Sequence, residues 1–329
     1  MTSQISLRRR RLAAALGAGS LLACTGARAQ GAIPRQVTFM LPQATGGGTD
    51  VFARAISTRL PKVLDTAIVM DYRPGAGGNV GSAWFARSAP RDGSSWMITV
   101  SSTQTINPLI YAHPGFDPIA DFEPVCGIGI LPVVLMASND MPVKTLADIV
   151  ALARKEPGRY SFGSPGSGTI SHLLMEYLKL SQKVQLVHVP YKGTAPALTD
   201  LAGGQINFLV SSIPPSLPLI RAGRVKAIAV PSQTRSAVLP NVPLASDVVP
   251  GMVGDIWVAL YAPKGTPREP IAQMREAVGK VLALPELDAV AEAQGGILLK
   301  AGPDEILALT TSEMERWRPV VKATGLKVD

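Results

Sequence analysis

The stretch Gly163-Ser-Pro-Gly-Ser-Gly-Thr-Ile-Ser-His172 leads from a short strand-like segment into an apolar helical pattern. Its glycines allow a sharp backbone turn, and Thr169 or Ser167 is placed to cap the helix that follows. Because first-turn amides of a helix carry partial positive charge, such a loop can hold a small anion. The alternative is a tight strand-to-helix turn without a ligand, which is the commoner role of glycine-rich loops.

A second loop of the same kind, Thr45-Gly-Gly-Gly-Thr-Asp50, lies between strand-like residues 36–41 and a helical pattern over 51–60. A glycine-rich turn at 73–79 and the hydroxyl-rich Ser101-Ser-Thr103 follow the next two expected strands. Strands that alternate with helices predict mostly parallel sheets, whose ligands lie beyond the carboxyl ends of the strands. The repetition of such loops favours binding over a simple turn.

The same alternation runs along the rest of the chain and predicts an α/β fold. We expect strands at 67–72, 96–100, 160–162, 185–189, 206–210 and 225–230, and helices at 80–89, 146–155, 170–180, 196–202, 271–284, 286–294 and 305–324. The apolar stretches 125–137 and 256–261 are interpreted as two segments that cross between domains.

The length of 329 residues suits two domains of ordinary size. We expect a first domain made of residues 30–127 together with 252–329, and a second made of residues 128–251. Residues 1–29 are expected to be a signal peptide and to belong to neither domain.

This N-terminal segment has a basic start at Arg8–Arg11, an apolar centre at 12–23 and the cleavage pattern Ala27-Arg-Ala29. We therefore expect export to the periplasm. The run Leu21-Leu-Ala-Cys24 resembles a lipobox, and processing there would leave a lipid-anchored protein with Cys24 at its N-terminus. Arg9-Arg10 leaves twin-arginine export open.

Cleavage after Ala29 removes five arginines and no acidic residue, so the formal net charge falls from +8 to +3. The high isoelectric point therefore belongs mainly to the export signal, which argues against nucleic acid as a partner. Only Cys126 would remain of the two cysteines, so no intrachain disulfide is expected and Cys126 is interpreted as a small core residue.

The chain lacks the motifs of common exported and nucleotide-binding enzymes. Thr169 stands where a Walker loop carries lysine, and neither G-x-S-x-G, S-x-x-K nor H-E-x-x-H occurs. Of three histidines, His188 lies in an apolar strand and is interpreted as half-buried, whereas His172 either faces a ligand or bonds locally. We expect no enzymatic activity, no cofactor and no metal.

Lys192 follows an expected strand end and precedes a helix, with Tyr191 beside it. Its ammonium group could reach the carboxylate of a ligand from the second domain. The alternative is an exposed loop lysine, which the spacing alone slightly favours.

Taken together, the segments resemble the Bug family, the receptors of tripartite tricarboxylate transporters. The resemblance covers the mature chain and rests on Gly46–Asp50, Arg73–Gly81, Asn107-Pro108, Gly166–Thr169 with His172, Val187–Gln205, Arg221–Gly223 and Ala262–Pro267. It implies a fold like that of the type II periplasmic binding proteins, with two α/β domains, a ligand cleft between them and two crossing segments.

The resemblance also implies a monomeric receptor that closes on a small carboxylate and delivers it to the membrane subunits of the transporter. A ligand-sensing subunit for a membrane signalling partner and an exported hydrolase remain the alternatives. The loops at 45–50 and 164–169 are implied to hold one carboxylate through backbone amides. Gly168→Val is expected to abolish the response to ligand while the protein stays folded, because the side chain would fill the anion site.

The ligand-binding residues expected from these arguments are Thr45, Gly46, Gly47, Thr49, Asp50, Ser102, Thr103, Ser164, Gly166, Ser167, Gly168, Thr169, His172, Tyr191, Lys192 and Ser211. Family members often carry Asp-Asn where this chain has Ser211-Ser212. Because an acid there could pair with an amino group, its loss favours a carboxylate without an amino group.

Overall fold

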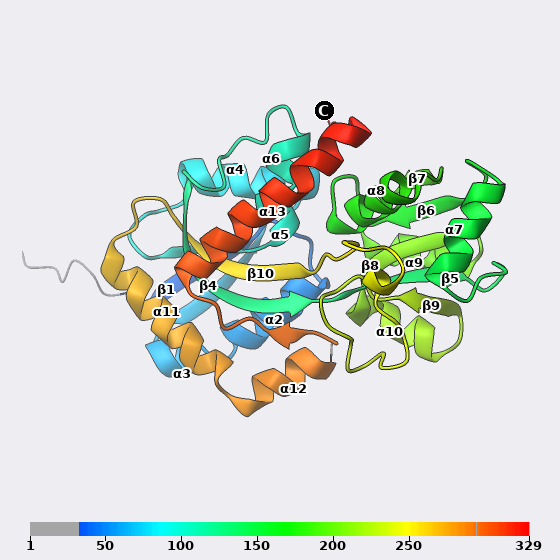
Figure 1. Ribbon diagram of the computed structural model, residues 1–329. Helices are drawn as coiled ribbons and strands as arrows, with labels where there is room; N and C mark the ends of the chain where they lie inside the picture. Colours follow the sequence, from blue (N-terminus) through cyan, green and yellow to red (C-terminus); the bar gives the residue numbers. More distant parts are fainter. Residues whose placement is uncertain (1–32, 294, 329) are drawn as a thin grey trace, which may run out of the picture.

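The computed structural model describes residues 33–293 and 295–328. Two mixed β-sheets with helices packed around them form its frame (Figure 1). The predicted export signal and Cys24 lie outside the described residues. No helix in the described part of the chain is long and apolar enough to cross a lipid bilayer.

The first sheet has six strands in the order β11-β4-β10-β3-β1-β2. They are β1 (Gln36–Leu41), β2 (Ala67–Tyr72), β3 (Ser95–Val100), β4 (Phe122–Leu131), β10 (Ile256–Pro263) and β11 (Ile297–Leu298). Strands β2 and β3 pair in parallel with β1, whereas β10 runs antiparallel to β3 and β4. The carboxyl ends of β1, β2 and β3 therefore meet at one edge.

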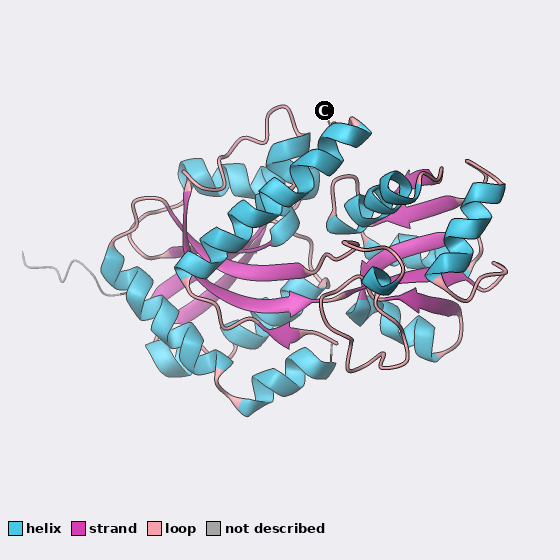
Figure 2. Ribbon diagram, in the orientation of Figure 1, coloured by secondary structure: helices cyan, strands magenta, loops and turns pink. Residues whose placement is uncertain are grey.

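Helices cover both faces of this sheet (Figure 2). They are α2 (Gly48–Ser57), α3 (Pro61–Leu64), α4 (Asn79–Ser88), α5 (Ser101–Thr105), α6 (Asn107–Ile110), α11 (Arg268–Leu282), α12 (Pro285–Ala293) and α13 (Pro303–Thr324), with the 3-10 turn η2 (Ala76–Gly78). Phe52 and Met274, on α2 and α11, pack in one apolar cluster against the sheet, whereas Phe85 and Ile306, on α4 and α13, belong to another.

The second sheet has five strands in the order β7-β6-β8-β5-β9. These are β5 (Val133–Ser138), β6 (Ser161–Ser164), β7 (Val187–Pro190), β8 (Phe208–Ser212) and β9 (Val225–Ala229), accompanied by α7 (Leu146–Lys155), α8 (Ile170–Gln182), α9 (Thr194–Ala202), α10 (Ile213–Arg221) and η3 (Ala245–Asp247). Strands β7 and β8 run parallel to β6, and β5 runs antiparallel to β8 and β9.

The apolar stretch 125–137 forms parts of two strands instead of one crossing segment. Strand β4 stays in the first sheet as far as Leu131, which pairs with Ile256, and β5 joins the second sheet at Val133. Pro132 separates them because proline has no backbone N–H to continue a ladder. The chain returns to the first sheet at Ile256, and the predicted crossing segment 256–261 is instead part of strand β10, which pairs with β3 and β4.

The two sheets are also joined through side-chain packing away from these connections. Ile110 of α6 and Trp317 of α13 belong to the same buried apolar cluster as Leu173 and Leu174 of α8. Helix α13 thus extends from the first sheet to the helices of the second (Figure 1).

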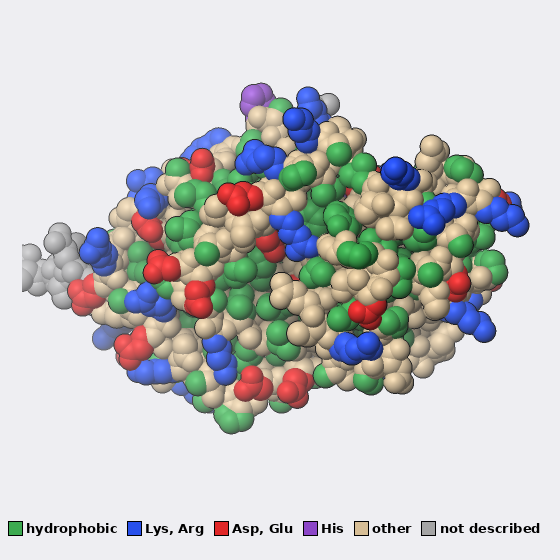
Figure 3. Space-filling view, viewed as in Figure 1, with side chains coloured by type: hydrophobic (Ala, Val, Ile, Leu, Met, Phe, Trp, Pro, Cys, Tyr) green, Lys and Arg blue, Asp and Glu red, His purple; other side chains and the backbone are tan. Residues whose placement is uncertain are grey.

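On the face of the molecule shown in Figure 3, acidic and basic side chains are interspersed. They do not gather into one basic patch on this face. This distribution agrees with the low charge expected for the chain without its first 29 residues.

Candidate ligand-binding site

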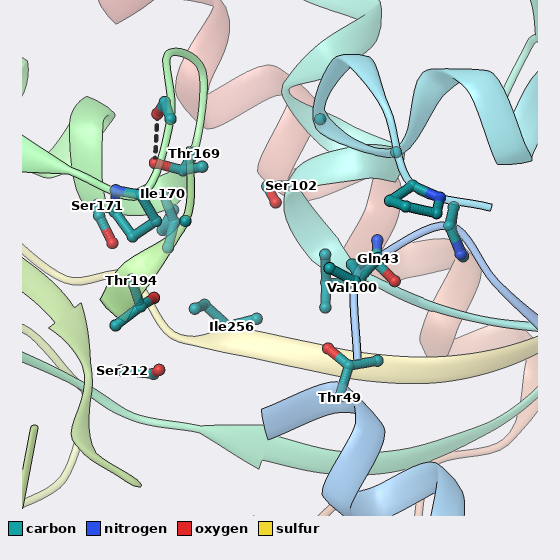
Figure 4. A pocket seen from close by; sticks show the side chains of 18 of the residues that line it. Gln43, Thr49, Val100, Ser102, Thr169, Ile170, Ser171, Thr194, Ser212 and Ile256 are labelled. Atoms are coloured by element: carbon teal, nitrogen blue, oxygen red, sulfur yellow. Dashed lines mark hydrogen bonds between the residues drawn. The ribbon is translucent and has the colours of Figure 1, made fainter. Parts of the chain in front are cut away.

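A cavity of about 640 Å³ lies where the carboxyl ends of parallel strands from both sheets approach each other (Figure 4). The first part of the chain lines it with Pro42, Gln43, Ala44, Gly48, Thr49, Pro74, Gly75, Ala76, Gly77, Gly78, Val100, Ser102, Tyr111 and Leu131. The second sheet and the return strand contribute Pro165, Gly166, Ser167, Thr169, Ile170, Ser171, Tyr191, Lys192, Gly193, Thr194, Ser212 and Ile256. The volume suits a small organic ligand.

Helix α2 presents its N-terminus to the cavity. Gly47 is the N-cap residue and has no side chain to cap the helix. The amides of the first two helical residues, Gly48 and Thr49, have no partner within a helix because of their position, and both residues line the cavity. This end of α2 therefore has the geometry with which helix N-termini bind anions.

Asp50 holds the α2 loop in shape. Its carboxylate accepts hydrogen bonds from the Gly46 amide at 2.9 Å, the Tyr72 hydroxyl at 2.5 Å and Arg54 Nε at 2.9 Å. Burial opposes ionisation of this carboxyl, but the bonds from Tyr72, Gly46 and Arg54 hold its pKa below the usual range. Asp50 does not line the cavity, so we assign it a supporting role.

The glycine-rich turn after β2 forms another wall of the cavity. Gly77 and Gly78 have positive φ angles of 65° and 101°. The Gly77 carbonyl accepts hydrogen bonds from Asn107 Nδ2 and Thr103 Oγ1, both at 3.0 Å. A Cβ at Gly78 would lie 2.8 Å from Thr103 Oγ1, which explains why the turn needs glycine there.

The loop between β6 and α8 uses three of its own backbone amides and that of His172 in α8 for internal hydrogen bonds. Gly166 N–H donates to Ser164 Oγ at 3.3 Å, Gly168 N–H to His172 Nδ1 at 3.2 Å, Thr169 N–H to the Gly166 carbonyl at 3.3 Å and His172 N–H to Thr169 Oγ1 at 3.4 Å. These bonds fix the orientation of each peptide in the loop.

Three other amides of this segment remain for a ligand. Ser167, Ile170 and Ser171 all line the cavity, and their amides have no acceptor among the residues that the structure describes. Ile170 and Ser171 are the first two residues of α8, where helical geometry leaves N–H groups unpaired. The second loop therefore repeats the arrangement at α2 from the opposite sheet.

The wall formed by the second sheet also carries hydroxyl groups. Ser171, Thr194 and Ser212 stand on this wall at the starts of α8, α9 and α10 (Figure 4). Ser212 is the N-cap residue of α10, yet its side chain makes no capping bond. In the described part of the chain these three hydroxyls have no hydrogen-bond partner, so they can bind the polar groups of a ligand.

The cavity contains one cationic side chain, that of Lys192, among the described residues. Lys192 is exposed on the loop before α9 and forms no ion pair within the described ranges. Neither aspartate nor glutamate lines the cavity among the residues 33–293 and 295–328. The site is thus suited to a negatively charged ligand.

Seven of the sixteen residues expected from the sequence line the cavity: Thr49, Ser102, Gly166, Ser167, Thr169, Tyr191 and Lys192. The other nine, Thr45, Gly46, Gly47, Asp50, Thr103, Ser164, Gly168, His172 and Ser211, lie beside it or behind its loops. For most of these the hydrogen bonds described above indicate a supporting role. Direct ligand contact by any of the sixteen stays a prediction.

The residues expected from the sequence differ from those that line the cavity. Ser212, rather than Ser211, lines the cavity, because neighbouring residues of a strand face opposite sides and Ser211 is fully buried. The turn at residues 74–78 was recognisable as a glycine-rich strand end, but it was not included among the expected site residues. Val100, Leu131 and Ile256 carry no sequence signal that separates them from core residues.

A model of the tripartite tricarboxylate transporter family receptor matches residues 52–326 of the chain. Protein BugT of Bordetella pertussis is 31% identical over 296 residues, which cover 89% of this chain and 90% of BugT.

Solved structures agree with this match. Rpa4515 of R. palustris, described with adipate, is 32% identical with a TM-score of 0.83, over 89% of this chain and 98% of that one. MatC of Rhodopseudomonas palustris, described with bound malate, is 29% identical with a TM-score of 0.80, over 88% of this chain and all of that one.

Proposed function

The chain belongs to the tripartite tricarboxylate transporter receptor family, which includes the Bug proteins, and from this we propose that it is a periplasmic receptor that captures a small carboxylate. The observation that carries the proposal is the cavity into which α2 and α8 direct unpaired first-turn amides from the two sheets. The relatives described with adipate and malate support a carboxylate as ligand.

One carboxylate of the ligand is proposed to lie between the two helix N-termini. Gly48 and Thr49 donate from α2, and Ser167, Ile170 and Ser171 donate from the α8 loop. A hydrogen bond to a charged group contributes about 1.5–3 kcal/mol, and micromolar affinity requires about 8 kcal/mol. A few of these amides with ordered water are therefore sufficient, without an arginine in the site.

The rest of the ligand is proposed to face the hydroxyls of Ser171, Thr194 and Ser212, with Lys192 beside them. These groups suit a second oxygen-rich group on the ligand. Since no acidic side chain lines the cavity among the described residues, an amino group would have no counter-charge there. We therefore propose a carboxylate without an amino group.

We propose that the ligand is enclosed by hinge closure of two domains, residues 30–127 with 252–329 and residues 128–251. The chain passes between the sheets at Pro132 and before Ile256, where small backbone rotations can change the width of the cavity. A ligand that bonds to both α2 and α8 stabilises the closed form. This form is proposed to be the one that the membrane subunits of the transporter recognise.

The test is thermal unfolding of the purified protein with adipate, malate and aspartate, combined with mass analysis of the ligand afterwards. We expect stabilisation by at least one of the two carboxylates without an amino group, none by aspartate, and an unchanged ligand mass. Turnover of the ligand would identify an enzyme instead of a receptor. If no member of a wider carboxylate panel raised the unfolding temperature, the proposal would also be contradicted.

A further inference from the structure

Two histidines are stacked behind the α8 loop. The rings of His172 on α8 and His188 on β7 lie with centroids 3.7 Å apart and planes inclined by only 12°. Phe162 of β6 continues the stack at 4.9 Å from His188. Neither histidine lines the cavity, and His172 is only 3% exposed, so the pair acts on the loop from inside the fold.

The contacts of His172 define its protonation state. Its Nδ1 accepts the Gly168 N–H at 3.2 Å, which requires an unprotonated Nδ1. The proton of the neutral ring must then be on Nε2, which points to Glu176 Oε1 at 3.5 Å. Glu176 is held in turn by Lys179 at 2.7 Å.

The contacts of His188 define a second proton position. Ser164 Oγ donates its single proton to the Gly166 carbonyl at 2.9 Å and accepts the Gly166 N–H at 3.3 Å. With the Ser164 proton on the Gly166 carbonyl, the remaining contact of this oxygen, to His188 Nε2 at 2.7 Å, is donated by the histidine. Burial, together with the neighbouring His172, lowers the pKa of His188 to about 3, so this ring stays neutral.

We propose that His172 and His188 are positioning residues for ligand binding: they hold the peptides of Gly166 and Gly168 so that the Ser167, Ile170 and Ser171 amides face the cavity. The proposal rests on the proposed carboxylate-binding function of the same loop. The histidines touch the loop and not the ligand.

The hydrogen bond from the buried Gly168 N–H to His172 Nδ1 fixes the orientation of that peptide. Glu176 and Lys179 of α8 hold the opposite side of the ring through Nε2. Removal of the Nδ1 acceptor would leave the Gly168 N–H without a partner, so the loop amides would lose their fixed orientation. Carboxylate affinity is then expected to fall.

The test compares adipate and malate affinity by calorimetry at neutral pH. His172→Asn places an amide oxygen near the position of Nδ1, whereas His172→Phe keeps the stacked ring without an acceptor. We expect affinity close to wild type for the asparagine variant and a loss of about tenfold or more for the phenylalanine variant. His113→Phe, at an exposed histidine, is the matched control and should behave as wild type.

A second measurement needs no ligand and no variant. Nitrogen-15 NMR of the wild-type histidines should show the Nε2–H form for both rings at neutral pH, with slow hydrogen exchange at the Gly168 amide. If the wild-type protein bound neither adipate nor malate, and no other carboxylate in a wider panel, the proposed function would be refuted. The NMR result on the two histidines would still stand. An Nδ1–H form of His172, or wild-type affinity in the phenylalanine variant, would overturn the role of the histidines.

Discussion

Gly168 is constrained by close packing between the α8 loop and the first part of the chain. It has a φ angle of +77°, and a Cβ added to it would lie 1.9 Å from Ile110 Cδ1 on α6. The sequence argument that a side chain here would fill the anion site is therefore wrong. The side chain would instead push the loop away from α6, so a folded Gly168→Val protein with a normal apo state is not expected.

Gly168→Ala is predicted to destabilise the protein by roughly 2–4 kcal/mol, through left-handed backbone strain and overpacking against Ile110. Urea unfolding without ligand measures this. Gly279→Ala is the control, because this residue of α11 has no atom within 4 Å of its added Cβ. That variant should be slightly more stable than wild type. Equal stability of the two variants would contradict the contact with α6.

At the scale of elements, α7 and α8 both begin at a threonine N-cap, and the cap of α8 lines the cavity. The Thr169 hydroxyl accepts the His172 N–H at 3.4 Å and donates to the Gly166 carbonyl at 2.8 Å. The Thr145 hydroxyl caps α7 by accepting the Asp148 N–H at 3.1 Å. The chemistry is the same, and only the cap of α8 borders the cavity.

Thr169→Ala and Thr145→Ala are each predicted to lower stability by about 1 kcal/mol through loss of an N-cap. Only Thr169→Ala should also weaken carboxylate binding, because the loop amides lose their fixed orientation. Thermal unfolding with and without the bound acid separates the two effects, and Thr169→Ser should restore binding. A parallel loss of ligand response in Thr145→Ala would mean that general stability, not the loop, controls binding.

At the scale of the whole molecule, a half-buried glutamate, Glu313, lies where α13 passes the return connection between the sheets. Glu313 accepts a hydrogen bond from Thr105 of α5 at 3.3 Å. The neighbouring Arg316 donates to the carbonyls of Gly251 and Val253, which precede β10. Burial raises the pKa of Glu313 to about 7, although Thr105 and Arg316 favour the ionised form.

A carboxyl with a raised pKa in the folded state binds its proton more tightly there than in the unfolded chain. Stability is therefore expected to fall as pH rises through the interval between the unfolded pKa and about 7. Glu313→Gln should match wild type near pH 5 and exceed it by on the order of 2 kcal/mol at pH 8. Urea unfolding at both pH values measures this, with the exposed Glu315→Gln as control.

The opposite sign, with Glu313→Gln less stable than wild type at pH 8, would show that the ionised carboxylate stabilises the packing of α13 on the crossing. Glutamine has nearly the size of glutamate, so a stability difference between the variant and wild type reports the charge of Glu313 and not a change in packing. Glu315→Gln should show no such pH-dependent difference from wild type.

The order of elements was largely accessible from the sequence, because periodicity and turn chemistry depend on neighbouring residues. The strand at 36–41, the strand at 67–72 and the helix at 146–155 with its Thr145 cap all have the predicted bounds. Within 125–137, the pattern did not separate the two strands, although Pro132 marked the break. The short helices α5 and α6 were missed because four or five residues are too few to show a helical period.

The sequence by itself determined that glycine-rich loops follow the strands of an α/β protein and that helices begin directly after them. Only the tertiary structure decided which amides remain free, that Ser212 and not Ser211 reaches the cavity, and that His172 lies against His188 behind the loop. The physical reason is that these facts depend on strand register and on contacts between residues far apart in the chain. No local pattern records them.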